Sequence, residues 1–407
     1  MTQAHSTTTP ADGLEGELLH LGSGGEADYA GKDARGKIVV TELSYAPPRP
    51  EKTRLATEHG ALAFSLSTGG GDDNPSMPMG TVKPAWGNPT MDDLHKMPTL
   101  PAVGIARRDG TRVLQLCQAG DAVRARIIAT GGREWRSINQ PDGILGAGST
   151  GDWILVGGHM DSWGGGAADN ASGNAVPLEV ARVLAGHRSE LCRDIQIGFW
   201  QAHEDGIMEG STWFVDYHWD KITRGLGYIN IDSPGMKHAE RYEATLSPEL
   251  WTWHRDVIRN VLGYVTEPQK LAKTGGQSFF GVGVPAIWGH SGFPPALLER
   301  WHGAVLGPWY QSTDDTTEVA DRRVLAHDLR MSVACAWELS IRPVLPYDFR
   351  DPARLLREAI DGYRHATDDT LGLDETASLA REFEIVAGRL FARQRRGGRS
   401  RGARPCN

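Results

Sequence analysis

Four short segments of this chain carry histidine and carboxylate side chains of the kinds that bind a divalent metal ion. The set comprises His159, Asp161, Asp169, His203, Glu204 and Asp232. Neutral imidazole nitrogens and carboxylate oxygens are the usual ligands of zinc in catalytic sites. If the carboxylates lay together without a cation, their pKa values would rise, so a metal ion is the natural counter-charge. The pattern therefore predicts metal-dependent chemistry, with zinc as the expected ion.

The segment from Gly158 to Gly173 is expected to bring two of these groups together. His159 ends an apolar strand, and the glycine run 164–166 lets the backbone turn sharply and return Asp169 to His159. Asp161 is placed to accept the other ring N–H of His159. A simpler interpretation stays open: the same residues form a strand, a glycine turn and a capped helix, in which His159 is only hydrogen-bonded.

Apolar strands alternating with helices must position these side chains. The expected strands are 153–157, 195–200, 226–231 and 284–288, and the expected helices are 171–186, 210–222, 249–261 and 322–340. This alternation predicts an α/β domain with a mixed or parallel sheet covered on both faces. Ligands of such sheets bind beyond the carboxyl ends of the strands, and each candidate ligand follows such an end.

The rest of the chain divides into three further parts. Residues 14–130 predict a small α/β lid domain, and residues 131–342 are expected to form the α/β domain described above, which would carry the catalytic site. Residues 343–392 have a helical pattern that fits packing against the catalytic domain or a second subunit. The basic, glycine-rich segment 393–407 is expected to be a disordered tail.

Composition excludes several classes of partner. The chain has 407 residues, a net charge of −8 and a pI near 6.0, which gives no reason to expect nucleic acid or a membrane surface as the main ligand. No signal segment or run of about 18 apolar residues is present. The cysteines Cys117, Cys192, Cys335 and Cys406 form no Cys-x-x-Cys pair, so no disulfide framework or sulfur-ligated metal site is indicated. A cytoplasmic location is expected.

The candidate ligands lie in motifs that resemble a known family. Gly157-Gly158-His159-Met160-Asp161-Ser162, followed by Ala168-Asp169-Asn170-Ala171-Ser172-Gly173, is similar to the signature of the zinc aminopeptidases and glutamate carboxypeptidases, whose non-peptidase relatives include the transferrin receptor. The likeness covers most of the chain. Residues 36–128 resemble the family's protease-associated domain, residues 309–316 its final metal loop, and residues 344–350 the start of its helical dimerisation domain.

The resemblance implies a role for each ligand. It makes His159 and Asp232 ligands of one metal ion, Asp169 a bridging carboxylate, and Glu204 a ligand of a second ion. It also implies a zinc-aminopeptidase-type mixed sheet flanked by helices, an inserted protease-associated domain, a C-terminal helical region and a homodimer.

Two positions depart from the family pattern. His203 stands where the family has a general-base Glu, and Gln311 stands where it has a His ligand of the second metal. An amide oxygen is a weak ligand, so we expect one tight zinc ion and a second that is weak or absent. His290 or His302 could fill the gap, although an ordinary histidine is the commoner interpretation of each. His203 itself could accept a proton, since an imidazole titrates near working pH, or could be a metal ligand.

The leading hypothesis is a metal-dependent hydrolase of amide bonds, of aminopeptidase or carboxypeptidase type. Its substrate would be a peptide or an N-acyl amino acid, with Asp161, His203 and Glu204 as catalytic residues and Gln277 and Tyr310 as substrate contacts. The alternative is a non-hydrolytic descendant: a binding scaffold, or an acyl-transfer or cyclising enzyme of a biosynthetic pathway. The clustered acidic groups count against the scaffold, because a site without a metal has no physical reason to keep them together.

Overall fold

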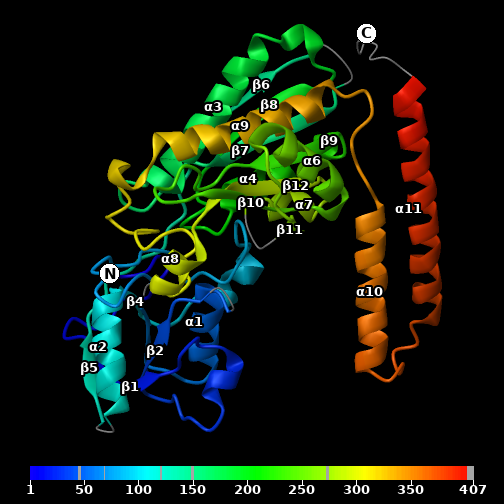
Figure 1. The fold of residues 1–407 in the computed structure, drawn as a ribbon. Coiled ribbons are helices and arrows are strands. Elements are labelled where there is room, and N and C mark those ends of the chain that lie inside the picture. The colour runs from blue at the N-terminus through cyan, green and yellow to red at the C-terminus, as the bar shows by residue number, and fades with distance from the viewer. Residues whose placement is uncertain (45–46, 68, 120–121, 148–150, 272–274, 401–407) are drawn as a thin grey trace.

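The chain folds into a small domain, a larger sheet domain and a helical hairpin (Figure 1). The structure, a computed structural model, describes residues 1–407 except 45–46, 68, 120–121, 148–150, 272–274 and 401–407. Of the side chains in residues 395–400 nothing is described. The structure is a mixed α/β fold, as the sequence predicts.

The small domain contains a five-stranded sheet within the described residues, in the order β4-β3-β2-β1-β5. Its elements are β1 (Leu14–His20), β2 (Ile38–Glu42), α1 (Arg49–Glu58), β3 (Ala63–Ser67), β4 (Ala102–Ile105), α2 (Arg107–Gln118) and β5 (Arg124–Ile127). Strands β1 to β4 are parallel, and β5 pairs antiparallel with β1. The fully buried strand β3 explains the apolar run at 61–66.

The larger domain contains a seven-stranded mixed sheet, again counted over the described ranges, in the order β11-β10-β12-β9-β7-β8-β6. The strands are β6 (Asp142–Leu145), β7 (Trp153–His159), β8 (Asp194–Trp200), β9 (Gly225–Asn230), β10 (Arg241–Leu246), β11 (Gln269–Lys270) and β12 (Ala286–Gly292). The four central strands β12, β9, β7 and β8 are parallel. Strand β10 runs antiparallel to β12 and parallel to β11, and β6 runs antiparallel to β8. Every residue of β7 is buried, as expected for a central parallel strand.

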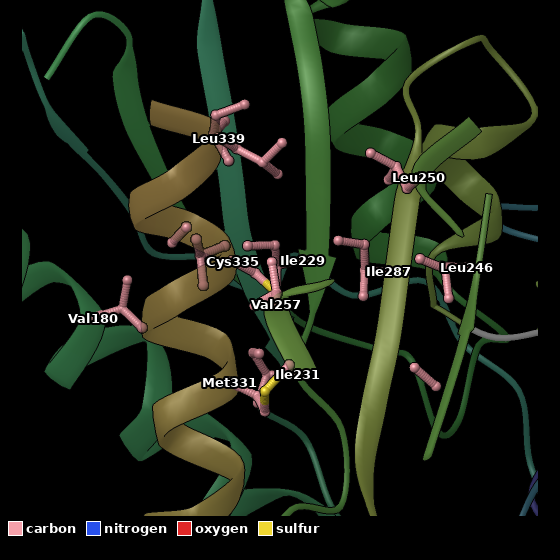
Figure 2. Packing of buried hydrophobic residues seen from close by; sticks show 14 of the residues in the cluster. Val180, Ile229, Ile231, Leu246, Leu250, Val257, Ile287, Met331, Cys335 and Leu339 are labelled. Carbon is pink, nitrogen blue, oxygen red and sulfur yellow. The ribbon is translucent and has the colours of Figure 1, made fainter. Parts of the chain in front are cut away.

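Helices cover both faces of the larger sheet. The helices of this domain are α3 (Ser172–Ala185), α4 (Glu209–Tyr217), α5 (Trp219–Ile222), α6 (Trp251–Leu262), α7 (Gln277–Phe280), α8 (Pro295–Arg300) and α9 (Arg322–Ile341). On one face, Val180 of α3, Val257 of α6 and Met331 of α9 pack against Ile229 and other strand residues (Figure 2). Aromatic side chains of α4 and α7 pack on the other face. These two layers hold the strands, and therefore their carboxyl ends, in fixed register.

The C-terminal helices α10 (Arg350–Ala366) and α11 (Asp374–Ser400) form a hairpin beside the sheet domain (Figure 1). Helix α11 continues through Ser400, into the segment 393–407 expected to be a disordered tail, and that expectation stays a prediction. The rest of the expected tail lies outside the described residues.

The structure describes three of the four cysteines. Cys117 and Cys335 are free thiols, whereas Cys192 is disulfide-bonded. Cys406 lies outside the described residues. Because a disulfide does not point to a reducing compartment, the cysteines no longer support a cytoplasmic location. Within the described part of the chain, no helix is long and apolar enough to cross a membrane.

Candidate metal centre

The carboxyl ends of three neighbouring strands bring the predicted ligands together. His159 is the last residue of β7, His203 and Glu204 follow β8, and Asp232 follows β9. Strand β7 lies between β8 and β9, and the three run parallel, so their carboxyl ends meet at one edge of the sheet. The turn before α3 returns Asp169 to the same place, where it is buried.

Three carboxylates surround the Nε2 atom of His159. It lies 3.0 Å from Asp169 Oδ1, 3.7 Å from Asp232 Oδ1 and 3.9 Å from Glu204 Oε1. His159 Nε2, both carboxylate oxygens of Asp169 and Glu204 Oε1 are buried and make no well-directed hydrogen bond within the described structure. Buried polar atoms without such bonds are costly unless a ligand satisfies them. The donor set fits a zinc ion.

His203 belongs to the same cluster. One ligand atom each from His159, His203 and Asp232 lie within 4.8 Å of one another, as do one each from His159, Asp169 and Glu204. The rings of His159 and His203 stack in parallel. Because both groups of ligand atoms include His159, His203 is close enough either to bind a metal ion or to contact a water molecule beside that ion.

Asp161 is held differently from the expectation. His159 Nδ1 lies 2.9 Å from the main-chain oxygen of Asp161 and 3.6 Å from its carboxylate. The carboxylate instead accepts the main-chain N–H groups of His203 (3.2 Å) and Glu204 (2.8 Å). The carboxylate of Asp161 therefore holds the loop after β8. Its main-chain carbonyl sets the tautomer of His159, because the ring nitrogen that faces this oxygen must carry a proton.

Asp315 holds the turn that carries Asp169. Its carboxylate accepts the main-chain N–H groups of Ala168 (2.8 Å) and Asp169 (2.9 Å). Asp315 is buried, and the sequence interpretation assigned it no role of its own. The only signal was its place in the 309–316 segment that resembles a metal loop, because spacing alone does not show which N–H groups a distant carboxylate accepts.

Burial and mutual repulsion set the pKa values of the centre. Burial raises the pKa of Asp169 to about 6, and burial together with Asp169 raises that of Glu204 well above its usual range. Burial opposes charge on His159, but the surrounding carboxylates outweigh it and raise the pKa well above the usual value. Burial also opposes charge on Asp232, yet His159 holds the pKa of Asp232 below its usual range. A bound cation would relieve this repulsion.

His203 has the opposite shift. Burial and the neighbouring His159 lower the pKa of His203 to about 4. Its imidazole is therefore neutral near pH 7 and keeps a nitrogen lone pair, which both proton acceptance and metal binding require.

The other predicted residues are distributed as follows. Gln311 lies against Glu204, with its Nε2 2.5 Å from Glu204 Oε2 and 3.0 Å from the Tyr310 hydroxyl. Tyr310 and Gln311 also line a cavity of about 150 Å³ that extends to α1 of the small domain. Gln277 starts α7, and its Oε1 is buried without a hydrogen bond among the described residues.

His290 and His302, the two histidines considered as replacement ligands, contact other groups. His290 Nδ1 lies 2.9 Å from the main-chain oxygen of Ser291, and His302 Nε2 lies 3.1 Å from Asp72 Oδ1. Neither belongs to the two candidate ligand groups found among the described residues. The gap at position 311 is therefore not filled by either side chain.

A mixed sheet between helical layers, with buried histidine and carboxylates at its carboxyl edge, defines a metallopeptidase-type α/β domain. Residues 143–330 match Peptidase family M28. The resemblance found in the sequence motifs is thereby confirmed for the catalytic domain. The match does not extend to the small domain or the hairpin.

Individual relatives and solved structures resemble most of the chain. The chain is 28% identical over 365 residues to Aminopeptidase YwaD of Bacillus subtilis (strain 168), which covers 83% of this chain and 70% of the relative. It is 22% identical to the Probable glutamate carboxypeptidase VP8 of Zea mays, over 86% of this chain and 57% of that protein. The structure of BSAP, a zinc aminopeptidase from Bacillus subtilis, gives a TM-score of 0.61 at 22% identity, over 86% of this chain and 81% of that one. A Peptidase M28 precursor from Shewanella amazonensis SB2B gives 0.66 at 17%, over 85% and 78%. At these identities the structures support the fold alone.

Proposed function

We propose that this protein is a zinc-dependent hydrolase of amide or peptide bonds in which His203 accepts a proton from the attacking water. The family match and the aminopeptidase relative support the metal-dependent peptide hydrolase. The observation that carries the proposal is the convergence of Asp169, Asp232 and Glu204 on His159 Nε2, with buried atoms that make no well-directed hydrogen bond among the described residues.

His159, Asp169 and Asp232 would hold the ion, with Glu204 beside it. A zinc ion supplies a Lewis acid for the substrate carbonyl and for water. The side chains of the protein orient the reacting groups and move protons. His203, neutral near pH 7, takes a proton from the attacking water on a ring nitrogen, and then returns it to the leaving amine. Asp161 holds the main chain of His203 and Glu204, and so fixes the base against the site.

Substrate and assembly are further parts of this proposal. A peptide or an N-acyl amino acid would reach the centre beside the cavity lined by Tyr310 and Gln311. The hairpin exposes apolar side chains that a second copy of the chain would cover, namely Leu356, Tyr363, Leu379, Ile385 and Val386. The homodimer stays a prediction, as do the cytoplasmic location and the protease-associated character of the small domain.

The test combines metal content with hydrolysis. Elemental analysis of the full chain should give about one equivalent of zinc, and the His159→Ala variant should retain almost none. Cleavage of aminoacyl anilides, dipeptides or N-acyl amino acids should stop after chelation and return with added zinc. A matched control is His238→Ala, which changes a histidine outside both ligand groups. Wild-type protein without metal, folded and unaffected by chelator, would overturn the proposal and favour a binding scaffold.

A further inference from the structure

The side-chain amide of Gln311 is held on both sides, which determines its orientation. Arg49 Nη2 lies 2.9 Å from Gln311 Oε1, while Gln311 Nε2 lies 2.5 Å from Glu204 Oε2. A guanidinium group has only donors, so the atom that faces Arg49 must be the amide oxygen. A carboxylate accepts, so the atom that faces Glu204 must be the amide nitrogen. Gln311 therefore offers the metal centre an N–H donor and not an oxygen.

The two oxygens of Glu204 consequently have different surroundings. Oε2 accepts from Trp163 Nε1 at 2.7 Å as well as from Gln311. Oε1 faces His159 Nε2 at 3.9 Å and is buried without a hydrogen bond in the described structure. Only the Oε1 side is left for a cation, because a lone pair that accepts an N–H is not available to a metal ion. The Oε2 side, where a second ion would be bound by Glu204 and residue 311, is closed by two donors.

The small domain supplies this arrangement. Arg49 is the first residue of α1, and Met79, from the loop that follows β3, donates its main-chain N–H to the main-chain oxygen of Gln311 at 2.7 Å. Gly80 makes room for the guanidinium, since a Cβ there would lie 1.4 Å from Arg49 Nη1. Both the main chain and the side chain of Gln311 are thus fixed from outside the catalytic domain.

We propose that Arg49 is a positioning residue that locks Gln311 as a hydrogen-bond donor to Glu204 and thereby limits the centre to one tightly bound divalent ion. The guanidinium charge acts in the same direction, because it repels a second dication near Gln311. The inference rests on the proposed function in one respect, namely that the group around His159 holds the first ion.

The experiment is a calorimetric titration of metal-free, full-length protein with Zn²⁺. Wild type should bind one ion tightly. Arg49→Ala and Arg49→Met remove the donor and the charge, so the amide can rotate its oxygen toward Glu204, and a second ion should bind roughly tenfold or more tightly than to wild type. Arg49→Met keeps much of the side-chain bulk, in case the alanine variant does not fold. Arg49→Lys keeps a cationic donor and should titrate like wild type.

Arg54→Ala is the matched control on the same helix, because Arg54 pairs with Glu51 and Glu58 and has an exposed side chain. It should leave both stoichiometry and affinity unchanged. The inference is overturned if wild type binds two ions with similar affinity, or if Arg49→Ala and Arg49→Met both titrate as wild type does. In those cases the proposed centre still holds an ion. Wild type that binds no ion at all would instead refute the proposed metal centre itself, and the inference with it.

Discussion

The imidazole rings of His159 and His203 lie parallel, with centroids 4.2 Å apart and an interplanar angle of 11°. Strands β7 and β8 pair in parallel with His159 opposite Trp200, so the loop that follows Trp200 returns His203 over His159. Ala202, next to His203, has a φ of 53°, a left-handed conformation that makes this return sharp. The stacking places an imidazole, not a carboxylate, against the ring of His159.

Changing His203 separates its two candidate roles. His203→Ala should keep about one equivalent of zinc but lower kcat by roughly 10²- to 10⁴-fold, because the proton acceptor is lost. His203→Glu supplies a carboxylate base and should recover part of the rate. His218→Ala, at the end of α4, is the matched control and should behave as wild type. Unchanged kcat in His203→Ala would show that His203 is not the base, and loss of zinc would show that it is a ligand.

Replacing Asp315 tests whether it positions Asp169. In Asp315→Asn, only one side-chain oxygen remains for the two main-chain N–H groups of Ala168 and Asp169, and the new NH₂ faces a donor. We expect zinc affinity to fall by roughly 10- to 100-fold, measured by competition with a chromophoric chelator. Asp314→Asn is the neighbouring control, since Asp314 is exposed and accepts from Ser76. Equal affinities in all three proteins would contradict this role.

His254 gives a pH prediction that does not involve the metal centre. It is fully buried on α6, neither ring nitrogen makes a hydrogen bond among the described residues, and burial lowers its pKa from 6.5 to about 4. Below pH 6.5 the unfolded chain therefore binds a proton at His254 that the folded chain does not. The free energy of unfolding should fall with decreasing pH, by about 2 kcal/mol from this residue between pH 7 and pH 5.

Urea unfolding in the presence of chelator measures this effect. His254→Leu removes the titrating group, so its loss of unfolding free energy from pH 7 to pH 5 should be about 2 kcal/mol smaller than that of wild type. His95→Leu changes an exposed histidine and should follow wild type. If His254→Leu loses as much stability as wild type over this pH range, the shifted pKa is not present in the folded protein.

The central strands and main helices could be predicted from the sequence because their signals are local. Strand β7 is a continuous buried apolar run, and helix α9 (322–341) agrees with the expected 322–340. Strands β6, β10 and β11 of the larger sheet were missed. Strand β6 is almost entirely exposed and has no apolar run. Strand β10 alternates between exposed and buried residues with charged groups at Arg241 and Glu243, and β11 has two residues, so neither has the apolar run that marks a central strand.

The ligand set also follows largely from local sequence. His159 ends a buried strand, Glu204 and Asp232 follow the two neighbouring strands, and parallel strands deliver the residues at their carboxyl ends to one edge. The hydrogen bonds around these residues could not be predicted from the local sequence. The main-chain oxygen of Asp161, and not its carboxylate, lies closest to His159 Nδ1, because the loop geometry after β7 sets that distance.

The sequence by itself determined the α/β class, the carboxyl-edge site and the two unusual positions, His203 and Gln311. Only the tertiary structure shows which groups those two side chains contact. Arg49 and Gln311 are 262 positions apart and meet because the small domain packs against the loop that carries Gln311. Strand and helix signals act over a few residues. A contact between domains depends on how two complete surfaces fit together, and the spacing of residues along the chain does not predict it.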